Sequence, residues 1–346
     1  FFKYINKYIF MININTFIFI IVVVFSIIFN DINPIFKPFE KFIMFVVIVS
    51  VFGPLFNTPK MILFRYNLQN YIKILILIFV SLSFGSLIIG YEMINNLRFH
   101  GLANNSMMMG PLASLAALIS IDCYKKAQSK NQIILFISLF FISIVSVILT
   151  ASRSAIISLL FSLILYSLFR SKNIISTIKY LSIVLFLIIL IVEVNPKGIL
   201  NNLYDKIEKR EAIDNITSGR DLMWEDRIKD FKLSPIIGVG FANYVNITYS
   251  KVDMFTGEDE PGSGWLYLLS SLGLIGFVFY ILPIVRIFSK INRESPISYY
   301  FLIFFCIHSI VEGYLLSTGS LLGILMWMSI ATSLDYHRNK RLKLFN

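Results

Sequence analysis

Long apolar segments, each close to the ~20 residues that a helix needs to cross a bilayer, dominate this chain and decide its fold class. They account for its composition, because 57% of the 346 residues are hydrophobic and 15% are charged, whereas a soluble protein carries about 25% charged residues. The sequence therefore predicts an all-α polytopic membrane protein that forms one membrane domain over residues 1–346. We expect about ten spans, at roughly 9–29, 40–57, 71–90, 106–122, 131–149, 153–170, 177–195, 262–286, 297–315 and 318–335.

The first apolar run is long enough to span and has no small-residue cleavage site behind it, so no cleavable signal peptide is expected. The chain begins at Phe1 rather than at a methionine, so either upstream sequence is missing or the chain is trimmed. Cys123 and Cys306 lie in or beside different apolar runs and imply no disulfide framework.

The net charge of +11 would suggest nucleic acid binding in a soluble protein, but here the basic residues gather in connections between apolar runs. They lie at both ends of the chain and in every even-numbered connection. The residues are Lys3, Lys7, Lys60, Arg65, Lys73, Lys125, Lys126, Lys130, Arg170, Lys172, Lys179, Arg286, Lys290, Arg293, Arg338, Lys340, Arg341 and Lys343. Basic connections stay in the cytoplasm. Both termini are therefore predicted to be cytoplasmic, the protein to lie in the bacterial cytoplasmic (inner) membrane, and no nucleic acid partner is expected.

One long connection, residues 196–260, is predicted to lie outside the cytoplasm. Over 197–260 it carries nine Lys/Arg and twelve Asp/Glu, so 9 − 12 gives −3. A helix is expected from Ser218, a capping residue, to about Lys232. Its spacing predicts one face with Trp224, Arg227, Ile228 and Phe231, with Asp226 and Asp230 elsewhere.

Three arginines stand on the predicted outer side: Arg98, Arg153 and Arg220. Arg153 begins the sixth span, where Ser152 or Ser154 can cap the helix; a helix N-terminus with an arginine is a good phosphate site. Its alternative role is an anchor at the membrane interface. Arg98 lies two residues before His100 and could equally be an ordinary loop residue. Arg220 opens the predicted loop helix, and its alternative is a solvated side chain.

His308 and Glu312 are four residues apart near the outer end of the ninth span, so they are expected to share a helix face. Ionisable groups inside a span are costly, which favours a functional role; the alternative is a polar pair that fixes helix packing. Nucleophile triads, nucleotide-binding motifs and metal-ligand spacings are not found, so no metal and no cofactor are expected.

Six segments, taken in order, resemble the O-antigen ligase/polymerase family, which includes the Wzy-type polymerases. They are Arg98-Phe-His-Gly-Leu, Thr150-Ala-Ser-Arg-Ser-Ala, Ser218-Gly-Arg-Asp-Leu-Met-Trp, Ser234-Pro-Ile-Ile-Gly-Val-Gly-Phe-Ala-Asn-Tyr, Gly264-Trp-Leu-Tyr-Leu-Leu-Ser-Ser-Leu-Gly-Leu-Ile-Gly and His308-Ser-Ile-Val-Glu-Gly. The resemblance covers roughly residues 98–330.

The resemblance implies a membrane fold like that of the GT-C glycosyltransferases and a metal-independent transfer of glycan from a polyprenyl diphosphate. It assigns Arg98, Arg153 and Arg220 to the diphosphate, where they stabilise the departing charge. The candidate general base is Glu312, with His308 and His100 behind it. The remaining candidate substrate contacts are Ser152, Ser154 and Trp224.

The expected partners are a polyprenyl-diphosphate-linked oligosaccharide and the lipid bilayer, and a chain-length regulator is left open. Ligases of this family carry a histidine shortly before the Gly-Leu-Ile-Gly helix, and Glu258 to Leu269 contains none, which favours a polymerase. The alternatives are a ligase that moves glycan to another acceptor, a flippase for lipid-linked sugars, and a purely structural membrane partner. One-sided arginines disfavour the flippase, which would need cations along a membrane-deep path.

Overall fold

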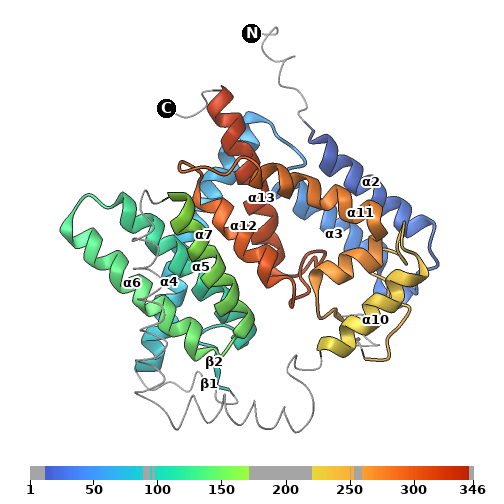
Figure 1. Cartoon of the computed structure of the whole chain (residues 1–346), viewed down its shortest axis with the longest axis horizontal. Coiled ribbons are helices and arrows are strands. Elements are labelled where there is room, and N and C mark those ends of the chain that lie inside the picture. Colours follow the sequence, from blue (N-terminus) through green and yellow to red (C-terminus); the bar gives the residue numbers. More distant parts are fainter. Residues whose placement is uncertain are drawn as a thin grey trace. The chain divides into compact units, whose positions relative to one another are not determined.

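The computed structural model describes residues 12–88, 94–95, 98–170, 220–249, 251–252 and 259–342 (Figure 1). Its helices are α2 (Ile14–Ile28), the 3-10 helix η1 (Pro34–Phe36), α3 (Pro38–Val51), α4 (Pro59–Ile88), α5 (Ser106–Lys126), α6 (Lys130–Leu149), α7 (Arg153–Arg170), α10 (Arg220–Leu233), α11 (Gly264–Phe288), α12 (Ile297–His308) and α13 (Leu321–Leu342). Two antiparallel ladders pair β1 (Ile94–Asn95) with β2 (Arg98–Phe99) and β3 (Lys251–Val252) with β4 (Asp259–Glu260).

Nine of the expected spans each coincide with a described helix, and the expected span at 177–195 lies outside the described residues. By length and composition, α4, α5, α6 and α11 can cross a membrane; α2, α7, α12 and α13 are shorter apolar helices. The chain is thus a helical membrane protein. Several boundaries differ from expectation: α4 begins at Pro59 rather than 71, α3 ends at Val51 rather than 57, α12 ends at His308 rather than 315, and α13 ends at Leu342 rather than 335.

Polar side chains define where several helices begin. Asn13, Asn105 and Ser263 cap α2, α5 and α11, each accepting a hydrogen bond from a backbone N–H in the first turn. Ser129 and Gln132 form a reciprocal capping box at the start of α6. These caps satisfy N–H groups that have no partner within the helix.

The described elements belong to two compact units. Unit 1 comprises Phe1–Asn67, Thr217–Ile291 and Ser309–Asn346, and unit 2 comprises Leu68–Ile216 and Asn292–His308.

The core of unit 1 is a cluster of aromatic rings, one from each of α2, α3, α11 and α13. Phe19 packs against Phe45, Tyr280 and Trp327 at centroid distances of 6.1, 5.4 and 6.3 Å, and Tyr280 meets Trp327 edge to face at 5.3 Å. All four side chains are nearly inaccessible. Edge-to-face pairs add to the stabilisation from buried area, so this cluster joins the helices of the unit.

Helix α11 is broken at Gly273, and a segment of the preceding loop fills the break. Gly273 has φ 62° and ψ −168°. Loop and helix backbones then exchange four hydrogen bonds: Val239 N–H to Ser270 O, Gly240 N–H to Ser271 O, Leu274 N–H to Pro235 O and Ile275 N–H to Ile236 O, at 2.9–3.2 Å. Non-helical backbone at membrane depth is tolerated where protein satisfies it. The Ser234-Pro-Ile-Ile-Gly-Val-Gly motif therefore supplies the backbone partners that the break in α11 needs.

Glycine is required on both sides of this junction. A Cβ at Gly273 would lie 2.3 Å from the carbonyl oxygen of Ile236, and a Cβ at Gly238 would lie 2.3 Å from that of Ser271. Backbone cannot give way as a flexible side chain can, so both positions exclude any larger residue.

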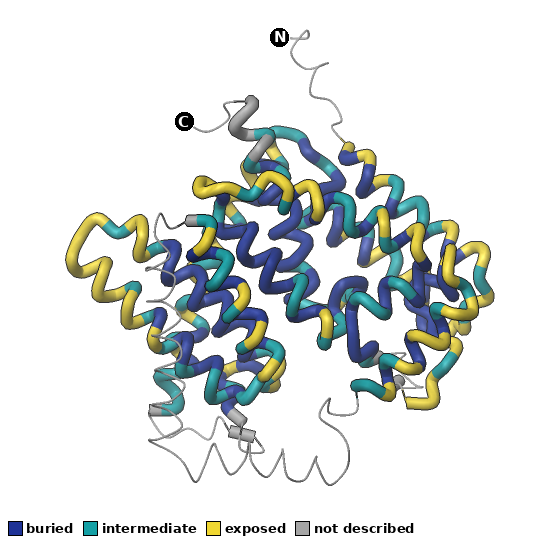
Figure 2. Tube along the Cα trace, viewed as in Figure 1, coloured by how far each residue is buried: buried dark blue, intermediate teal, exposed yellow. Residues whose placement is uncertain are grey.

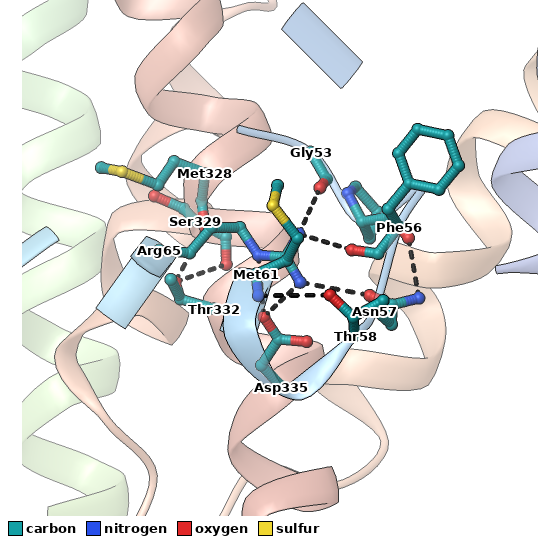
Figure 3. A network of polar contacts seen from close by, with 11 residues as sticks. Gly53, Phe56, Asn57, Thr58, Met61, Arg65, Met328, Ser329, Thr332 and Asp335 are labelled. Atoms are coloured by element: carbon teal, nitrogen blue, oxygen red, sulfur yellow. Dashed lines mark hydrogen bonds and ion pairs between the residues drawn. The ribbon is translucent and has the colours of Figure 1, made fainter. Parts of the chain in front are cut away.

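A buried ion pair joins α4 to α13 (Figure 3). Arg65 Nε and Nη2 donate to Asp335 Oδ2 at 2.9 and 2.7 Å, and the Arg65 side chain is 0% exposed. Its other donors reach the carbonyl oxygens of Gly53 and Phe56 at 3.0 and 2.8 Å and Asn57 Oδ1 at 3.2 Å. Arg65 was expected in a basic connection, and that expectation is wrong: it lies inside α4 and contributes no surface charge.

The centre of unit 2 is α5, which is buried continuously from Met109 to Asp122 (Figure 2). Its contact face is rich in small residues, which let membrane helices approach closely. A Cβ at Gly110 would meet Ser152 Cβ at 3.0 Å and Thr150 Oγ1 at 3.1 Å. Close packing against Gly110 therefore holds the corner between α6 and α7, where one group of candidate residues lies.

Candidate functional site

In unit 1, the N-terminus of α10 is fastened to the segment that follows α12. Arg220 Nη2 pairs with Glu312 Oε1 at 2.7 Å, with side-chain exposures of 13% and 19%. Arg220 Nη1 donates to the carbonyl oxygen of Val311. The pair is thus largely enclosed yet reachable, and it brings together two residues that the sequence separates by ninety-two positions.

The surrounding backbone holds this pair in place. The N–H of Gly264, the first residue of α11, donates to the carbonyl oxygens of Ser309 and Glu312 at 2.9 and 3.1 Å. Gly313 lies so close to Pro261 that a Cβ would be 2.0 Å from the proline ring. The start of α11 and the turn around Glu312 therefore form one rigid junction.

Trp224 lies one turn beyond Arg220 on α10. Its Nε1–H donates to the carbonyl oxygen of Gly262 at 3.1 Å, and the ring is partly exposed. An aromatic ring fixed beside a charged pair is a suitable surface for a sugar, because the ring face is apolar and its orientation is set.

The environment of Glu312 alters its acidity. It lies in the connection between α12 and α13, outside both helices. Burial raises the pKa of the Glu312 carboxyl above its usual value, and the charge and hydrogen bond of Arg220 offset part of this rise. A carboxylate with a raised pKa is a stronger base than an ordinary one.

The helix predicted from Ser218 to about Lys232 is confirmed as α10 over the described residues, but the predicted separation of Arg227 from Asp226 and Asp230 is wrong. The buried residues are Met223, Asp226, Arg227 and Asp230, whereas Ile228 is 41% exposed. The buried polar residues hold the loop that follows. Asp230 Oδ1 accepts from the backbone N–H and the side-chain amide of Asn246 at 2.8 and 2.7 Å.

Arg227 completes this polar face. Its guanidinium lies 4.0 Å from the ring centroid of Tyr244 and forms an ion pair with Asp230 at 2.7 Å. Its Nη2 donates to the carbonyl oxygen of Asn246 at 2.6 Å. Arg227 therefore stabilises the loop after α10; the sequence signal was its spacing of three from Asp230, which favours a pair on one helix face.

In unit 2, the turn between α6 and α7 builds the predicted helix N-terminus. Ala151 adopts φ 52°, a left-handed conformation, and Arg153 begins α7. Ser152 is the cap, because its Oγ accepts from the N–H of Ala155 at 3.4 Å. Arg153 is exposed. The expected arrangement of a serine cap, a helix N-terminus and an arginine is therefore present.

A chain of hydroxyls leads from this turn to His308. Ser152 Oγ lies 3.3 Å from Ser154 Oγ, which lies 3.4 Å from His308 Nε2. His308 is buried, and its ring stacks on Phe304 at 5.3 Å. The expectation that His308 and Glu312 share a helix face is wrong, because α12 ends at His308. The turn at Ser309 separates the two side chains into different units.

Arg98 lies in β2, and its side chain lies outside the described residues. His100 is partly exposed, and its Nδ1 lies 2.9 Å from the carbonyl oxygen of Ala103. A carbonyl can only accept, so Nδ1 carries the hydrogen in this contact. Gly101, at φ 55°, allows this turn to approach Ser83 on α4.

The predicted site residues thus form two groups, with Arg220, Trp224 and Glu312 in unit 1 and Arg98, His100, Ser152, Arg153, Ser154 and His308 in unit 2. Comparison with known families matches residues 138–281 to the family model described as O-antigen ligase. The matched segment includes Ser152, Arg153, Ser154, Arg220 and Trp224. No curated protein matches the chain. Residues 138–281 carry the sequence pattern of the O-antigen ligase family, which confirms the resemblance of this membrane protein to the O-antigen ligase/polymerase family.

Proposed function

We propose that this chain is a polymerase that joins polyprenyl-diphosphate-linked oligosaccharide repeat units on the outer side of the bacterial cytoplasmic membrane. The family match supports glycan transfer in a membrane. The observation that carries the proposal is the Arg220–Glu312 pair at 2.7 Å, partly exposed at the rigid start of α11. A cation for the leaving diphosphate and a carboxylate for the acceptor proton are the two groups that this reaction needs.

In the proposed reaction, the acceptor hydroxyl oxygen attacks the anomeric carbon of the donor sugar, and the bond from that carbon to the diphosphate oxygen breaks. Glu312 takes the hydroxyl proton, and the diphosphate leaves with the electron pair. Arg220 is placed to stabilise that charge with its planar donor fork. When the diphosphate engages Arg220, Glu312 loses its ion partner and becomes free to act as the base.

The serine cap and Arg153 at the start of α7 are proposed as a phosphate-binding group of unit 2. A helix N-terminus presents unpaired N–H groups and a partial positive charge, and Arg153 adds a full one. Ser152, Ser154 and His308 then line the approach to that anion. The assignment of Arg98 and His100 to the same substrate stays a prediction from the resemblance.

A ligase that transfers finished glycan to another acceptor is the second candidate, because the matching family model is described as O-antigen ligase. The lack of a histidine between Glu258 and Leu269, where the resemblance places one in ligases, favours the polymerase.

The test uses a strain in which this gene is the sole polymerase of its locus. Glu312→Gln and Arg220→Lys should reduce the surface polysaccharide to single repeats, since loss of a general base costs about 10²–10⁴ in rate. Lys229→Gln is the matched control, because Lys229 lies on the same helix, is 46% exposed and forms an exposed ion pair with Glu225. Membrane levels of each variant are measured alongside.

The exchanged pair Arg220→Glu with Glu312→Arg separates chemistry from packing. If the pair only fastens α10 to the turn, the exchange restores polymer; if it performs the reaction, the exchange does not. If Glu312→Gln still made polysaccharide of normal length and amount, Glu312 would not be the base. Accumulation of full-length lipid-linked polymer in the variants would favour a ligase, and glycan trapped on the cytoplasmic side would favour a flippase.

A further inference from the structure

Unit 1 has a second polar feature at the end of α11 remote from Glu312. A cavity of about 300 Å³ opens there between the start of α2 and the last turns of α11 and α13. Gly264 and Arg286 mark the two ends of α11, roughly 30 Å apart along the helix axis. A volume near 300 Å³ suits a small polar ligand.

The lining of this cavity is strongly cationic. Arg286, Lys290 and Arg338 contribute three positive side chains, and no carboxylate is among the lining residues that the structure describes. Asn13 and Asn15 add polar groups from the start of α2, whose N-terminal dipole is also positive. Every polar contribution therefore favours an anion.

Arg338 has a side-chain donor without a hydrogen-bond acceptor among the described residues. Its Nη1 is buried, and within the described part of the chain it has no hydrogen-bond partner. The nearest carboxylate on its own helix, Asp335, gives its Oδ2 to Arg65, and its Oδ1 has no hydrogen-bond partner among the described residues. A buried donor without a partner is unfavourable, and more so when the group is charged.

Cations in the last turn of a helix are favourable without any ligand, because they complement the helix dipole. That explanation accounts for Arg286 and Lys290, which are exposed at the end of α11. Arg338 differs from these two residues, because its side chain is only partly exposed and still lines the cavity.

We propose that this cavity binds the phosphate of an anionic phospholipid headgroup. The three cations and the α2 N-terminus match a phosphodiester, while the apolar lining residues Ile12 and Ile14, 40% and 63% exposed, continue toward the lipid. Basic pockets between membrane helices are a recognised form of headgroup site. The basic connections predict that this end faces the cytoplasmic leaflet. The site is independent of the proposed glycan transfer.

The experiment uses the full chain, purified and delipidated in a neutral detergent. Thermal unfolding is followed while phosphatidylglycerol, phosphatidylcholine or inorganic phosphate is added. Phosphatidylglycerol should stabilise the protein, and phosphatidylcholine should not. Arg338→Gln and Arg286→Gln should each weaken the apparent lipid affinity about tenfold, the loss expected for one charge-assisted contact.

Lys60→Gln is the matched control, because Lys60 is an exposed cation of the same unit outside the cavity. Arg286 is exposed, so its variant tests binding even if Arg338→Gln folds poorly. Equal losses in Lys60→Gln and the cavity variants would mean general charge attraction and would overturn the proposal. Equal stabilisation by inorganic phosphate would assign the cavity to a free anion, and no response to any addition would also overturn it.

Discussion

The buried pair of Arg65 and Asp335 should be among the most sensitive points of the chain. In Asp335→Ala, Arg65 Nε and Nη2 lose their acceptor while the guanidinium stays 0% exposed. Removing one partner of a buried ion pair costs about 3–5 kcal/mol, because the remaining charge is uncompensated. Each kcal/mol lowers the melting temperature of a unit of this size by ~2–4 °C, so the melting temperature should fall by roughly 6–20 °C.

Arg65→Lys tests the geometry separately from the charge. Lysine has three donors where the guanidinium uses five, so at least two of the five hydrogen bonds to Gly53, Phe56, Asn57 and Asp335 would be lost. We expect a loss of about 2–3 kcal/mol, since each neutral bond contributes about 1 kcal/mol. The assay is thermal unfolding of the purified protein in one detergent.

The control is Glu225→Ala, which breaks the exposed pair with Lys229 and should leave the melting temperature almost unchanged, because exposed ion pairs contribute little. If Asp335→Ala melted within one or two degrees of Glu225→Ala, the network in Figure 3 would not hold α4 to α13, and the reasoning would be refuted.

Three further predictions concern the broken helix, the α6–α7 turn and the proposed base. Gly273→Ala should abolish stable expression or lower the melting temperature by well over 10 °C, because its Cβ would lie 2.3 Å from backbone atoms. The control is Gly85→Ala, whose Cβ would have no atom within 4 Å, so its expression should be unchanged and its melting temperature equal or slightly higher. Ala151→Gly should stabilise the protein by about 1 kcal/mol and so raise its melting temperature, since φ 52° strains any residue with a Cβ. A lower melting temperature would contradict that strain. The transfer rate of purified protein should fall on acidification at a pH above the ~4.3 usual for glutamate, because burial raises the pKa of Glu312 and its unprotonated form is needed. An acid limb at the ordinary value would contradict the assignment.

Much of the helical framework could be predicted from local signals. The apolar runs predicted the helices, and Ser152, one of two predicted caps, caps α7 as expected. The loop helix α10 was predicted within two residues at its start and one at its end. Each of these features depends on residues close together in sequence, where spacing and capping determine the outcome.

The failures concern contacts between distant residues. Arg65 resembles a loop cation until Asp335, 270 positions away, is brought beside it. The buried face of α10 is polar because Asn246 and Tyr244 return to satisfy Asp230 and Arg227, and no helical period encodes that return. Likewise, Glu312 lies beyond the end of α12, where its backbone carbonyl accepts from the N–H of Gly264 and its side chain pairs with Arg220.

The break in α11 has a consequence for exchanging parts between relatives. The loop of residues 234–240 and the helix of residues 270–275 complete each other's backbone hydrogen bonds, so neither is self-sufficient in a hydrocarbon environment. A chimera that replaces the outer loop but keeps the resident α11 would leave carbonyl and N–H groups unmatched inside the bilayer. Substrate-range engineering by loop grafting must therefore move both segments as one module, although about thirty residues separate them in the sequence.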